Sequence, residues 1–405
     1  MKQARLHNTD IPAPTERVIL AGLLTGSSDP ALFEIDIKEM RMLCATAGAT
    51  IVETIIQRRE APIASTYMGP GKLAEISALM KQHGCKTVII DAQLSPGQVR
   101  NIEKIVEGKV LDRSQLILDI FARHAKTNEA RIQVELAQMK TMYPRLTHAW
   151  THFSQQVGGI GTKGPGEKQL EVDRRLIQKK ISDLNHKLKT IEKSRATQRK
   201  SRADEFKVTL VGYTNVGKSS LLNALSGADV LVQNKLFATL DTATRRTFIP
   251  GAGEIVLSDT VGFLRKLPHH LVASFKGTLE VVSQANLLLV VMDAASPWSA
   301  QQLATVKKVL SDLSATTIPR LYIFNKIDLV SNPVELENLT FAHPDALLVS
   351  SLSPSDMALV KERIADVVRT YRKEAAISDI VARETEELAN EDEPRHGLPW
   401  ENGKD

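Results

Sequence analysis

The sequence predicts an α/β protein in which two parallel-sheet units are joined by a pair of long helices. Short apolar runs alternate with longer amphipathic segments in residues 1–126 and again in 205–372, which is typical of strands covered by helices. In residues 127–204, apolar residues instead recur at the spacing of a coiled coil. We therefore expect an N-terminal α/β domain, a helical hairpin, a doubly wound α/β domain, and a tail at 373–405.

The first unit contains four apolar runs that are expected to be buried strands, with four helices between them. The strands are expected at 18–24, 50–56, 88–90 and 110–111, and the helices at 32–47, 71–81, 97–107 and 113–124. Strict alternation of this kind favours a small parallel sheet. Near residue 70, the segment from Gly69 to Lys72 lacks the spacing of a phosphate loop and is interpreted as a turn before a helix.

The middle region reads as two long helices joined by a loop. Ile132, Leu136 and Met139 predict a helix over 127–143, which Pro144 is expected to end. A glycine-rich loop from Gly158 to Glu167 follows. The second helix carries an apolar stripe made of Leu170, Ile177, Ile181, Leu184, Leu188 and Ile191.

Charge is distributed unevenly along the chain. Lys and Arg total 52 against 47 Asp and Glu, and much of the surplus lies between residues 174 and 202, while residues 384–393 are acidic. A basic helix can neutralise nucleic-acid phosphates, and the glycine-rich loop before it can enter a crowded RNA site. On the residues alone, a solvated coiled-coil face is the simpler interpretation.

Composition excludes several classes of protein. The two cysteines, Cys44 and Cys85, form no CxxC pair, so we expect neither a disulfide framework nor a zinc site, and a reducing, cytoplasmic compartment. No long uncharged apolar stretch or secretion signal is present, so no transmembrane segment is predicted. Peripheral association with a membrane surface stays open.

The second unit begins a new α/β pattern after residue 204. Strands are expected at 207–211, 255–259, 287–293, 321–325 and 347–350, and helices at 218–226, 271–282, 300–313 and 356–372. This order fits a doubly wound parallel sheet. A further short helix is expected to about residue 389, with the last dozen residues disordered.

A phosphate loop follows the first of these strands. Its glycines let backbone N–H groups turn toward phosphates at a helix N-terminus, while Lys218 supplies positive charge and the Ser219 hydroxyl ligates Mg²⁺. The alternative is an ordinary glycine turn before a helix. The motif G-x4-GK[ST] comprises Gly212, Tyr213, Thr214, Asn215, Val216, Gly217, Lys218 and Ser219.

Two further segments close apolar strands. The first is Asp259-Thr260-Val261-Gly262, in which the aspartate can hold Mg²⁺ through water and the Gly262 amide can approach a γ-phosphate. The second is Asn325-Lys326-Ile327-Asp328, whose carboxylate can accept both N1–H and the 2-amino group of guanine. A site built on such hydrogen bonds rejects the wrong base by roughly 10⁴ or more. The sequence therefore predicts GTP, with GDP as product, rather than ATP.

Two less specific segments complete the expected site. Backbone N–H groups of Ser350, Ser351 and Leu352 are candidates to meet the guanine O6, although an ordinary strand end is the simpler interpretation. The threonine-rich loop before residue 259 is expected to be switch I. It contains Phe237, Ala238, Thr239, Leu240 and Asp241, with Thr239 as the second Mg²⁺ ligand and Thr242 and Thr244 as competitors.

The expected catalytic residues are Lys218, Thr239 and Gly262. Phe263 stands where a water-orienting glutamine would be in Ras-like switches, and its side chain cannot orient water. Intrinsic hydrolysis is therefore expected to be slow, and acceleration to need another group of the chain, a partner, or a monovalent cation such as K⁺ near Asn215.

These motifs resemble the HflX family of translational GTPases, and the resemblance covers most of the chain. Besides the GTPase segments, the motifs that carry it are Thr66 to Ile76, Leu94 to Gln98 with Asn101, Asp112 to Ser114, Gln133 to Ala137 and Gly158 to Glu167. The resemblance implies an N-terminal HflX domain, a two-helix linker, and a P-loop GTPase domain with Mg²⁺ at Ser219 and Thr239. It also implies association with the large ribosomal subunit and ribosome splitting or rescue under stress.

The sequence departs from the family pattern at three positions. Lys168 stands where threonine is expected, Thr242 where proline is usual, and Ser351 where alanine is usual. The first two bear on loop dynamics and the third on guanine binding.

Three functional hypotheses follow from these residues. The first is a monomeric GTP-hydrolysing switch on the ribosome. The second is a nucleotide-gated regulator of a non-ribosomal protein or membrane-surface partner. A tRNA-modifying GTPase is disfavoured, because the accessory region has no obvious catalytic cysteine or cofactor motif.

Overall fold

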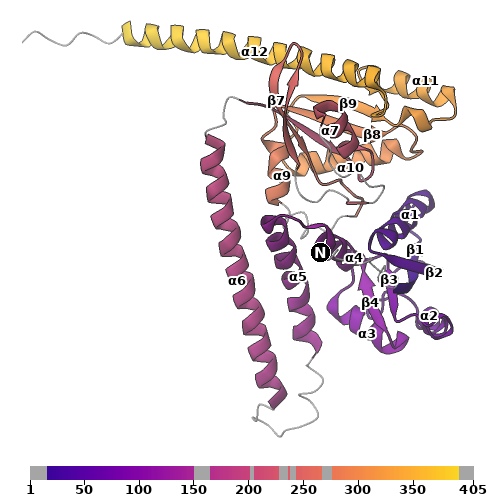
Figure 1. Cartoon of the computed structure of the whole chain (residues 1–405). Coiled ribbons are helices and arrows are strands. Elements are labelled where there is room, and N and C mark those ends of the chain that lie inside the picture. The colour runs from indigo at the N-terminus through magenta and orange to yellow at the C-terminus, as the bar shows by residue number, and fades with distance from the viewer. Residues whose placement is uncertain are drawn as a thin grey trace, which may run out of the picture.

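The computed structural model describes residues 16–149, 165–200, 205–227, 236–237, 243–266 and 276–391. Two α/β units lie next to each other, and a long helical hairpin projects beside them (Figure 1). The mixed α/β fold with parallel sheets is the one that the sequence predicts.

The N-terminal unit is a four-stranded parallel sheet in the order β2-β1-β3-β4. Its helices begin where the sequence supplies caps: Ser95 and Asp112 each form a capping box with the glutamine three residues later. The strands are β1 (Glu16–Thr25), β2 (Ala49–Arg59), β3 (Thr87–Ile90) and β4 (Lys109–Asp112), and the helices are α1 (Pro30–Thr46), α2 (Pro70–His83), α3 (Pro96–Val106) and α4 (Arg113–His124). All eight elements were predicted, with small differences at their ends.

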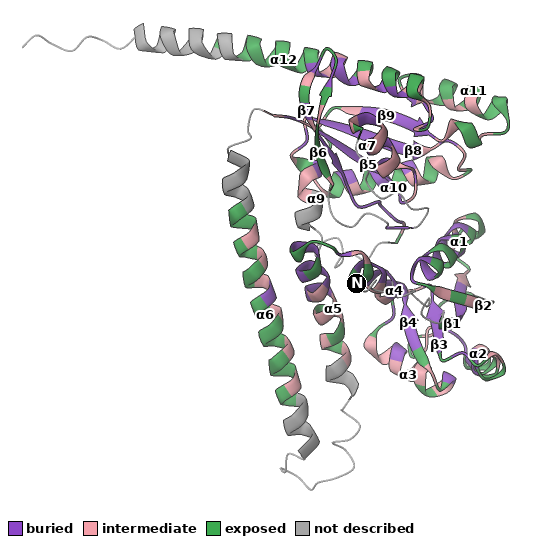
Figure 2. Cartoon of the chain, viewed as in Figure 1, coloured by how far each residue is buried: buried purple, intermediate pink, exposed green. Residues whose placement is uncertain are grey.

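The hairpin consists of α5 (Asn128–Ala149) and α6 (Pro165–Lys200). Ile132, Leu136 and Leu184 are buried between the two helices, as the apolar stripe predicts. Figure 2 shows that the coloured part of α6, residues 171–194, is otherwise mostly exposed. The predicted glycine-rich loop lies outside the described residues up to residue 164, after which α6 begins.

Pro144 does not end α5, so that prediction was wrong. The missing N–H and the ring of a proline normally break a helix. Here the turn is held on both sides: Gln178 Nε2 donates to the Tyr143 hydroxyl at 2.6 Å, and Arg145 Nη2 pairs with Asp112 Oδ2 at 3.0 Å. These contacts with α6 and with the N-terminal unit keep the segment helical.

The second unit has a six-stranded sheet in the order β10-β9-β8-β5-β7-β6. All neighbouring pairs are parallel except β6 and β7. The strands are β5 (Phe206–Gly212), β6 (Thr244–Ile249), β7 (Gly253–Asp259), β8 (Leu287–Asp293), β9 (Arg320–Asn325) and β10 (Leu347–Leu348). The antiparallel edge strand β6 was not predicted, because its polar residues are largely exposed and form no buried apolar run.

Helices cover the second sheet, and two of them differ from expectation. They are α7 (Lys218–Ser226), α9 (Lys276–Ser283), α10 (Ser299–Asp312), the short 3₁₀ helix η1 (Ile327–Leu329), α11 (Pro333–Ala342) and α12 (Pro354–Glu391). Helix α11 was missed, since none of its residues is buried and it gives no periodic apolar signal. Helix α12 is one continuous helix rather than two, and the predicted disordered end lies outside the described residues.

No helix among the described residues is long and apolar enough to cross a membrane. Cys44 and Cys85 are both buried with free thiols.

Replacing Leu184 with Ala is expected to loosen the hairpin. Its side chain is 1% exposed and fills the contact between α5 and α6. The resulting cavity should cost about 2–5 kcal/mol, and amide hydrogen exchange in α6 should quicken. Leu176→Ala on the same helix is the control, since Leu176 is 60% exposed. Equal exchange in the two variants would contradict the packing described here.

Candidate functional site

The site lies at the carboxyl edge of the second sheet. Strand β5 is central and buried, and it pairs in parallel with β7 and β8. Because parallel strands end at the same edge, the residues that follow them converge there. Gly212, Asp259, Asp293 and Asn325 end β5, β7, β8 and β9 respectively.

The phosphate loop and the β9 end are locked together at Gly217. This glycine has φ +92°, and a Cβ at this position would collide with the Asn325 side-chain amide. Asn325 Nδ2 donates to the Val216 carbonyl at 3.0 Å, and Asn325 Oδ1 accepts the Ser351 N–H at 3.0 Å. One buried amide thus connects three of the predicted segments.

Lys218 is buried within the phosphate loop. Its Nζ donates to the Tyr213 carbonyl at 2.9 Å and lies 3.4 Å from the Gly212 carbonyl. Burial lowers the pKa of Lys218 to about 8, and the nearby Asp259 carboxylate opposes that shift. A phosphate beside Nζ would restore the charged form.

A hydroxyl and a carboxylate meet next to Lys218. Ser219 Oγ donates to Asp259 Oδ2 at 2.6 Å, and the Asp259 side chain is fully buried. Thr260 Oγ1 donates to the Leu210 carbonyl at 2.7 Å, which fixes the strand end. Oxygen donors of this kind suit Mg²⁺, either directly or through water, so the residues present fit the metal.

The expected guanine loops are held by carboxylates that sequence analysis did not single out. Lys326 Nζ bonds both the Asn215 carbonyl and Asp293 Oδ2, each at 2.7 Å. The Ser350 N–H donates to Asp356 Oδ2 at 2.8 Å. Asp293 ends a buried apolar strand as Asp259 does, and that signal was available in the sequence.

Asp328 is oriented by the loop after β10. The Ser350 hydroxyl donates to Asp328 Oδ1 at 2.6 Å, which restrains the carboxylate. In this conformation the amides of Ser350 and Ser351 are already bonded within the chain, so they can reach a guanine O6 only by giving up those partners. Leu352 is 81% exposed, and Ile327 is half-buried.

The segment after β7 lies directly on the phosphate loop. The Thr214 N–H donates to the Phe263 carbonyl at 2.8 Å, and the Phe263 N–H donates to the Gly212 carbonyl at 3.0 Å. A Cβ on Gly262 would lie 2.6 Å from Thr214 Cα and 3.0 Å from Lys218 Nζ. Only a glycine fits this close contact with the lysine.

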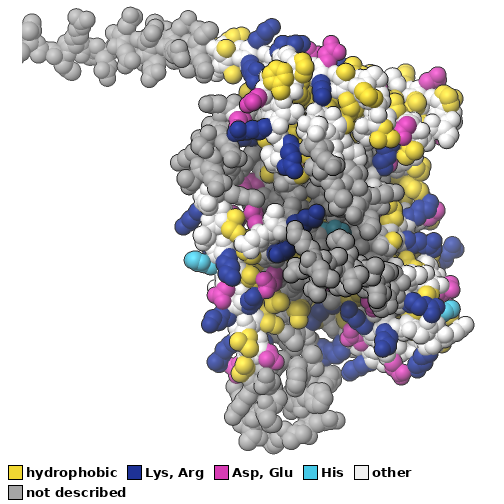
Figure 3. Space-filling view, viewed as in Figure 1, with side chains coloured by type: hydrophobic (Ala, Val, Ile, Leu, Met, Phe, Trp, Pro, Cys, Tyr) yellow, Lys and Arg dark blue, Asp and Glu magenta, His cyan; other side chains and the backbone are white. Residues whose placement is uncertain are grey.

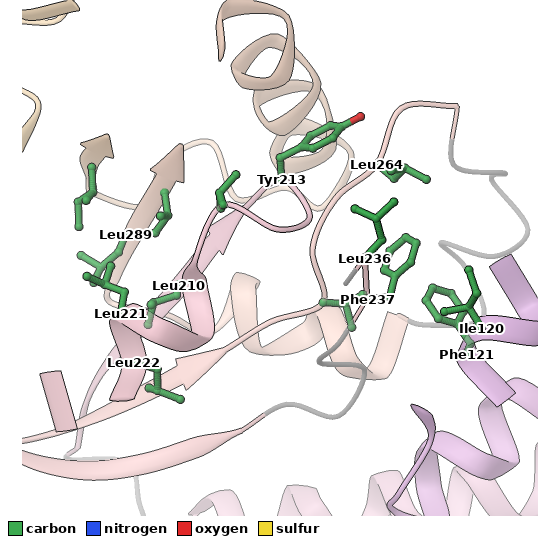
Figure 4. Packing of buried hydrophobic residues seen from close by; sticks show 14 of the residues in the cluster. Ile120, Phe121, Leu210, Tyr213, Leu221, Leu222, Leu236, Phe237, Leu264 and Leu289 are labelled. Carbon is green, nitrogen blue, oxygen red and sulfur yellow. The ribbon is translucent and has the colours of Figure 1, made fainter. Parts of the chain in front are cut away.

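The expected switch I is described only in part. Residues 238–242, which include Ala238, Thr239, Leu240 and Asp241, lie outside the described residues. Phe237 is buried with φ +55°, and its ring meets Phe121 of α4 edge-on, with 4.7 Å between ring centroids. Figure 4 shows the Phe237 ring beside Phe121 of the N-terminal unit, with Ile120 next to it.

A phosphate loop alone occurs in many nucleotide hydrolases. The braced segment from Asn325 to Asp328 at the same sheet edge restricts the class to P-loop GTPases. Three family models match the chain in succession. They are the N-terminal region of GTP-binding GTPases at residues 34–122, their middle region at 124–202, and a 50S ribosome-binding GTPase domain at 207–326.

The sequence relatives specify the family. GTPase HflX of Flavobacterium psychrophilum is 46% identical over 313 residues, covering 77% of this chain and 76% of the relative. GTPase HflX of Escherichia coli is 46% identical over 299 residues, covering 73% and 70%. The chain belongs to the HflX family of GTPases, and the reaction it catalyses is GTP hydrolysis.

A more distant likeness is seen among solved structures. The crystal structure of a GTP-binding protein from Sulfolobus solfataricus in complex with GDP is 23% identical, with a TM-score of 0.46. The match covers 87% of this chain and 99% of that one.

Replacing Asp328 with Asn is expected to weaken binding of GDP by about 10- to 100-fold, because one charge-assisted hydrogen bond to the base is lost and its acceptor becomes a donor. Binding of ADP should change little, so the preference for guanine narrows. Calorimetric titration of both nucleotides measures this. The control is Asp345→Asn, which removes an exposed carboxylate from the same unit; an unchanged preference in Asp328→Asn would place base recognition elsewhere.

Nucleotide binding is expected to take up a proton at alkaline pH. Lys218 has a pKa of about 8, so it is largely neutral at about pH 9, and a bound phosphate restores its proton. Below about pH 7 the lysine is already charged, so nucleotide binding no longer adds a proton to it. Affinity for GDP should therefore fall as pH rises through 8.

Calorimetry of GDP binding in buffers with different ionisation enthalpies measures that uptake. In Lys218→Arg the guanidinium stays charged throughout this range, so the lysine's share of the uptake should disappear. The same buffer dependence in both proteins would show that Lys218 does not titrate on binding.

Proposed function

We propose that this GTPase acts on the large ribosomal subunit, in splitting, rescue or recycling of ribosomes under stress. A row of exposed cations on α6 carries the proposal. The family model that matches residues 207–326 is described as a 50S ribosome-binding GTPase, which supports the same partner.

The cations occupy the face of α6 that points away from α5. Residues spaced by three, four and seven positions share one face of a helix. This α6 stripe consists of Arg175, Lys179, Lys189 and Lys193, all exposed, with His186 in line. Figure 3 shows Lys and Arg side chains along the outer side of the molecule, where α6 lies in Figure 1.

The α6 stripe can bind RNA, because the opposite face of α6 makes the contact with α5. The apolar face of α6 already contacts α5, and Lys180, which borders it, pairs with Glu135 of α5 at 2.9 Å. Cations in a row can follow an RNA backbone, and each phosphate they neutralise makes affinity fall as salt rises.

The nucleotide site supplies the switch. We assign the phosphates to Lys218 and the phosphate-loop amides, and the guanine to Asp328. Mg²⁺ would be held by the hydroxyls of Ser219 and Thr239, with Asp259 behind them, and it supplies charge neutralisation at the phosphates. K⁺ held by Asn215 of the phosphate loop is a second candidate cation, because Phe263 cannot orient water.

The same proposal places the protein in the cytoplasm as a monomer. The alternative is a nucleotide-gated regulator of a non-ribosomal protein or of a membrane surface. This alternative requires that binding to the partner persists after nuclease treatment and at high salt. Ribosome binding would not persist under those conditions.

We expect the protein to co-sediment with purified large ribosomal subunits in the presence of a non-hydrolysable GTP analogue, and those subunits to raise GTP hydrolysis. Replacing Lys179 and Lys189 with Gln should weaken binding and reduce the slope of log affinity against log salt by about two. Lys307→Gln with Lys308→Gln is the control, since it removes two exposed lysines from α10.

Lys218→Ala should abolish the nucleotide dependence of this binding. A partner retained after nuclease treatment, together with no co-sedimentation, would favour the alternative function.

A further inference from the structure

Helix α11 is rich in apolar residues but has no buried residue. Six of its ten residues are apolar, and none of the ten is buried. A helix that is apolar on more than one side is normally covered by other protein. Here Phe341 is 91% exposed and Val334 is 55% exposed, so two large apolar side chains face solvent. Figure 2 shows exposed residues along α11, at the edge of the GTPase unit.

The two exposed side chains lie on one side of α11. Positions 334 and 341 are seven residues apart, a spacing that returns to the same side of a helix. The opposite side carries Leu336 and Leu339, both half-buried, and Leu339 packs against a buried apolar cluster that includes Phe324. The inward side therefore attaches the helix to its unit, and the outward side exposes apolar area that the described part of the chain does not cover.

The outward side is acidic as well as apolar. Glu337 and Asn338 lie between the two apolar residues on that side, and both are exposed. We call Val334, Glu337, Asn338 and Phe341 the α11 face. Between Lys326 and Lys361 the sequence has no Lys or Arg, although the whole chain has 52. The acidic residues of that stretch are Asp328, Glu335, Glu337, Asp345 and Asp356.

This charge excludes several occupants. Carboxylates repel the phosphates of RNA, and α11 offers no cation to neutralise them. An anionic lipid surface is disfavoured for the same reason. A second copy docked face to face would place like charges opposite each other, because a two-fold contact pairs a surface with itself. The α11 face therefore suits a different protein, one that is positively charged.

The shape of the α11 face indicates how such a protein would bind. An aromatic side chain at the centre of an interface, surrounded by polar groups, supplies much of the binding energy. Opposite charges around it set orientation and association rate. Proteins that pack among ribosomal RNA are rich in Lys and Arg, because they neutralise its phosphates. They have the charge that the α11 face requires.

We propose that the α11 face docks a lysine- and arginine-rich protein of the large ribosomal subunit, with an apolar side chain of that protein against Phe341 and its cations near Glu337. This inference rests on the proposed function and adds a protein contact to the RNA contact of the α6 stripe. Figure 1 places α11 and α6 on opposite sides of the molecule. The subunit is thus contacted at two separate places, through surfaces of opposite charge.

Reversing the charge of the α11 face tests the class of partner. In Glu337→Lys a cation would face the cations of the docked protein, so affinity for purified large subunits should fall about tenfold in the presence of a non-hydrolysable GTP analogue. An RNA partner predicts the opposite sign. Glu362→Lys is the matched control, since it reverses an exposed carboxylate on α12 of the same unit. Unchanged or tighter binding of Glu337→Lys overturns the proposal.

Removing the aromatic side chain tests the apolar contact. Phe341→Ala should weaken subunit binding by about 10- to 30-fold and leave the slope of log affinity against log salt unchanged, because no phosphate contact is lost. Melting temperature and GTP hydrolysis without subunits should also be unchanged. The control is Phe248→Ala on β6, a phenylalanine that is 68% exposed between Arg246 and the strand end. No weakening by Phe341→Ala, or equal weakening by Phe248→Ala, contradicts the assignment.

Photo-crosslinking identifies what lies against the face. With p-benzoyl-phenylalanine in place of Phe341, irradiation of the complex with purified large subunits should join this chain to one Lys- and Arg-rich ribosomal protein, identified by mass spectrometry. An adduct with ribosomal RNA or with a second copy, or no adduct although the labelled protein co-sediments, overturns this inference alone. Absence of co-sedimentation by the unlabelled parent protein overturns the proposed function and this inference with it.

Discussion

The close approach of Asn325 to Gly217 is the contact on which the site depends. With any side chain at position 217, the end of β9 is pushed away from the phosphate loop. The Asn325 amide then loses the Val216 carbonyl and the Ser351 amide together. The phosphate-binding and base-binding parts of the nucleotide site are thus held in register by one buried side chain, that of Asn325. It can approach closely because Gly217 has no side chain.

The two sheets face each other with the edges at which their parallel strands end. Asp91 and Arg113 directly follow strands of the N-terminal sheet, and Tyr213 directly follows the central strand of the second. In parallel sheets this edge carries function. Here one functional edge is covered by another, and the buried charges between them are costly unless every partner stays in place.

The sequence identified the features that a local motif or a buried run encodes. The phosphate loop from Gly212 to Ser219 and the strands that end in Asp259 and Asn325 were predicted, because each combines required residue types with an apolar strand. Contacts between distant segments were not predictable in this way: Tyr213 and Glu39 are far apart in sequence, and neither carries a signal of the other. Strand β6 and helix α11 were missed because they bury almost nothing.

Helix α12 has a mechanical consequence. Its first half packs on the GTPase unit, and Tyr371 still meets Phe206 edge-on at 5.1 Å. The helix then continues to Glu391 away from that unit (Figure 1). At 1.5 Å per residue the projecting part measures about 30 Å. A rigid rod of that length turns a tilt of a few degrees at its base into a displacement of ångströms at its tip.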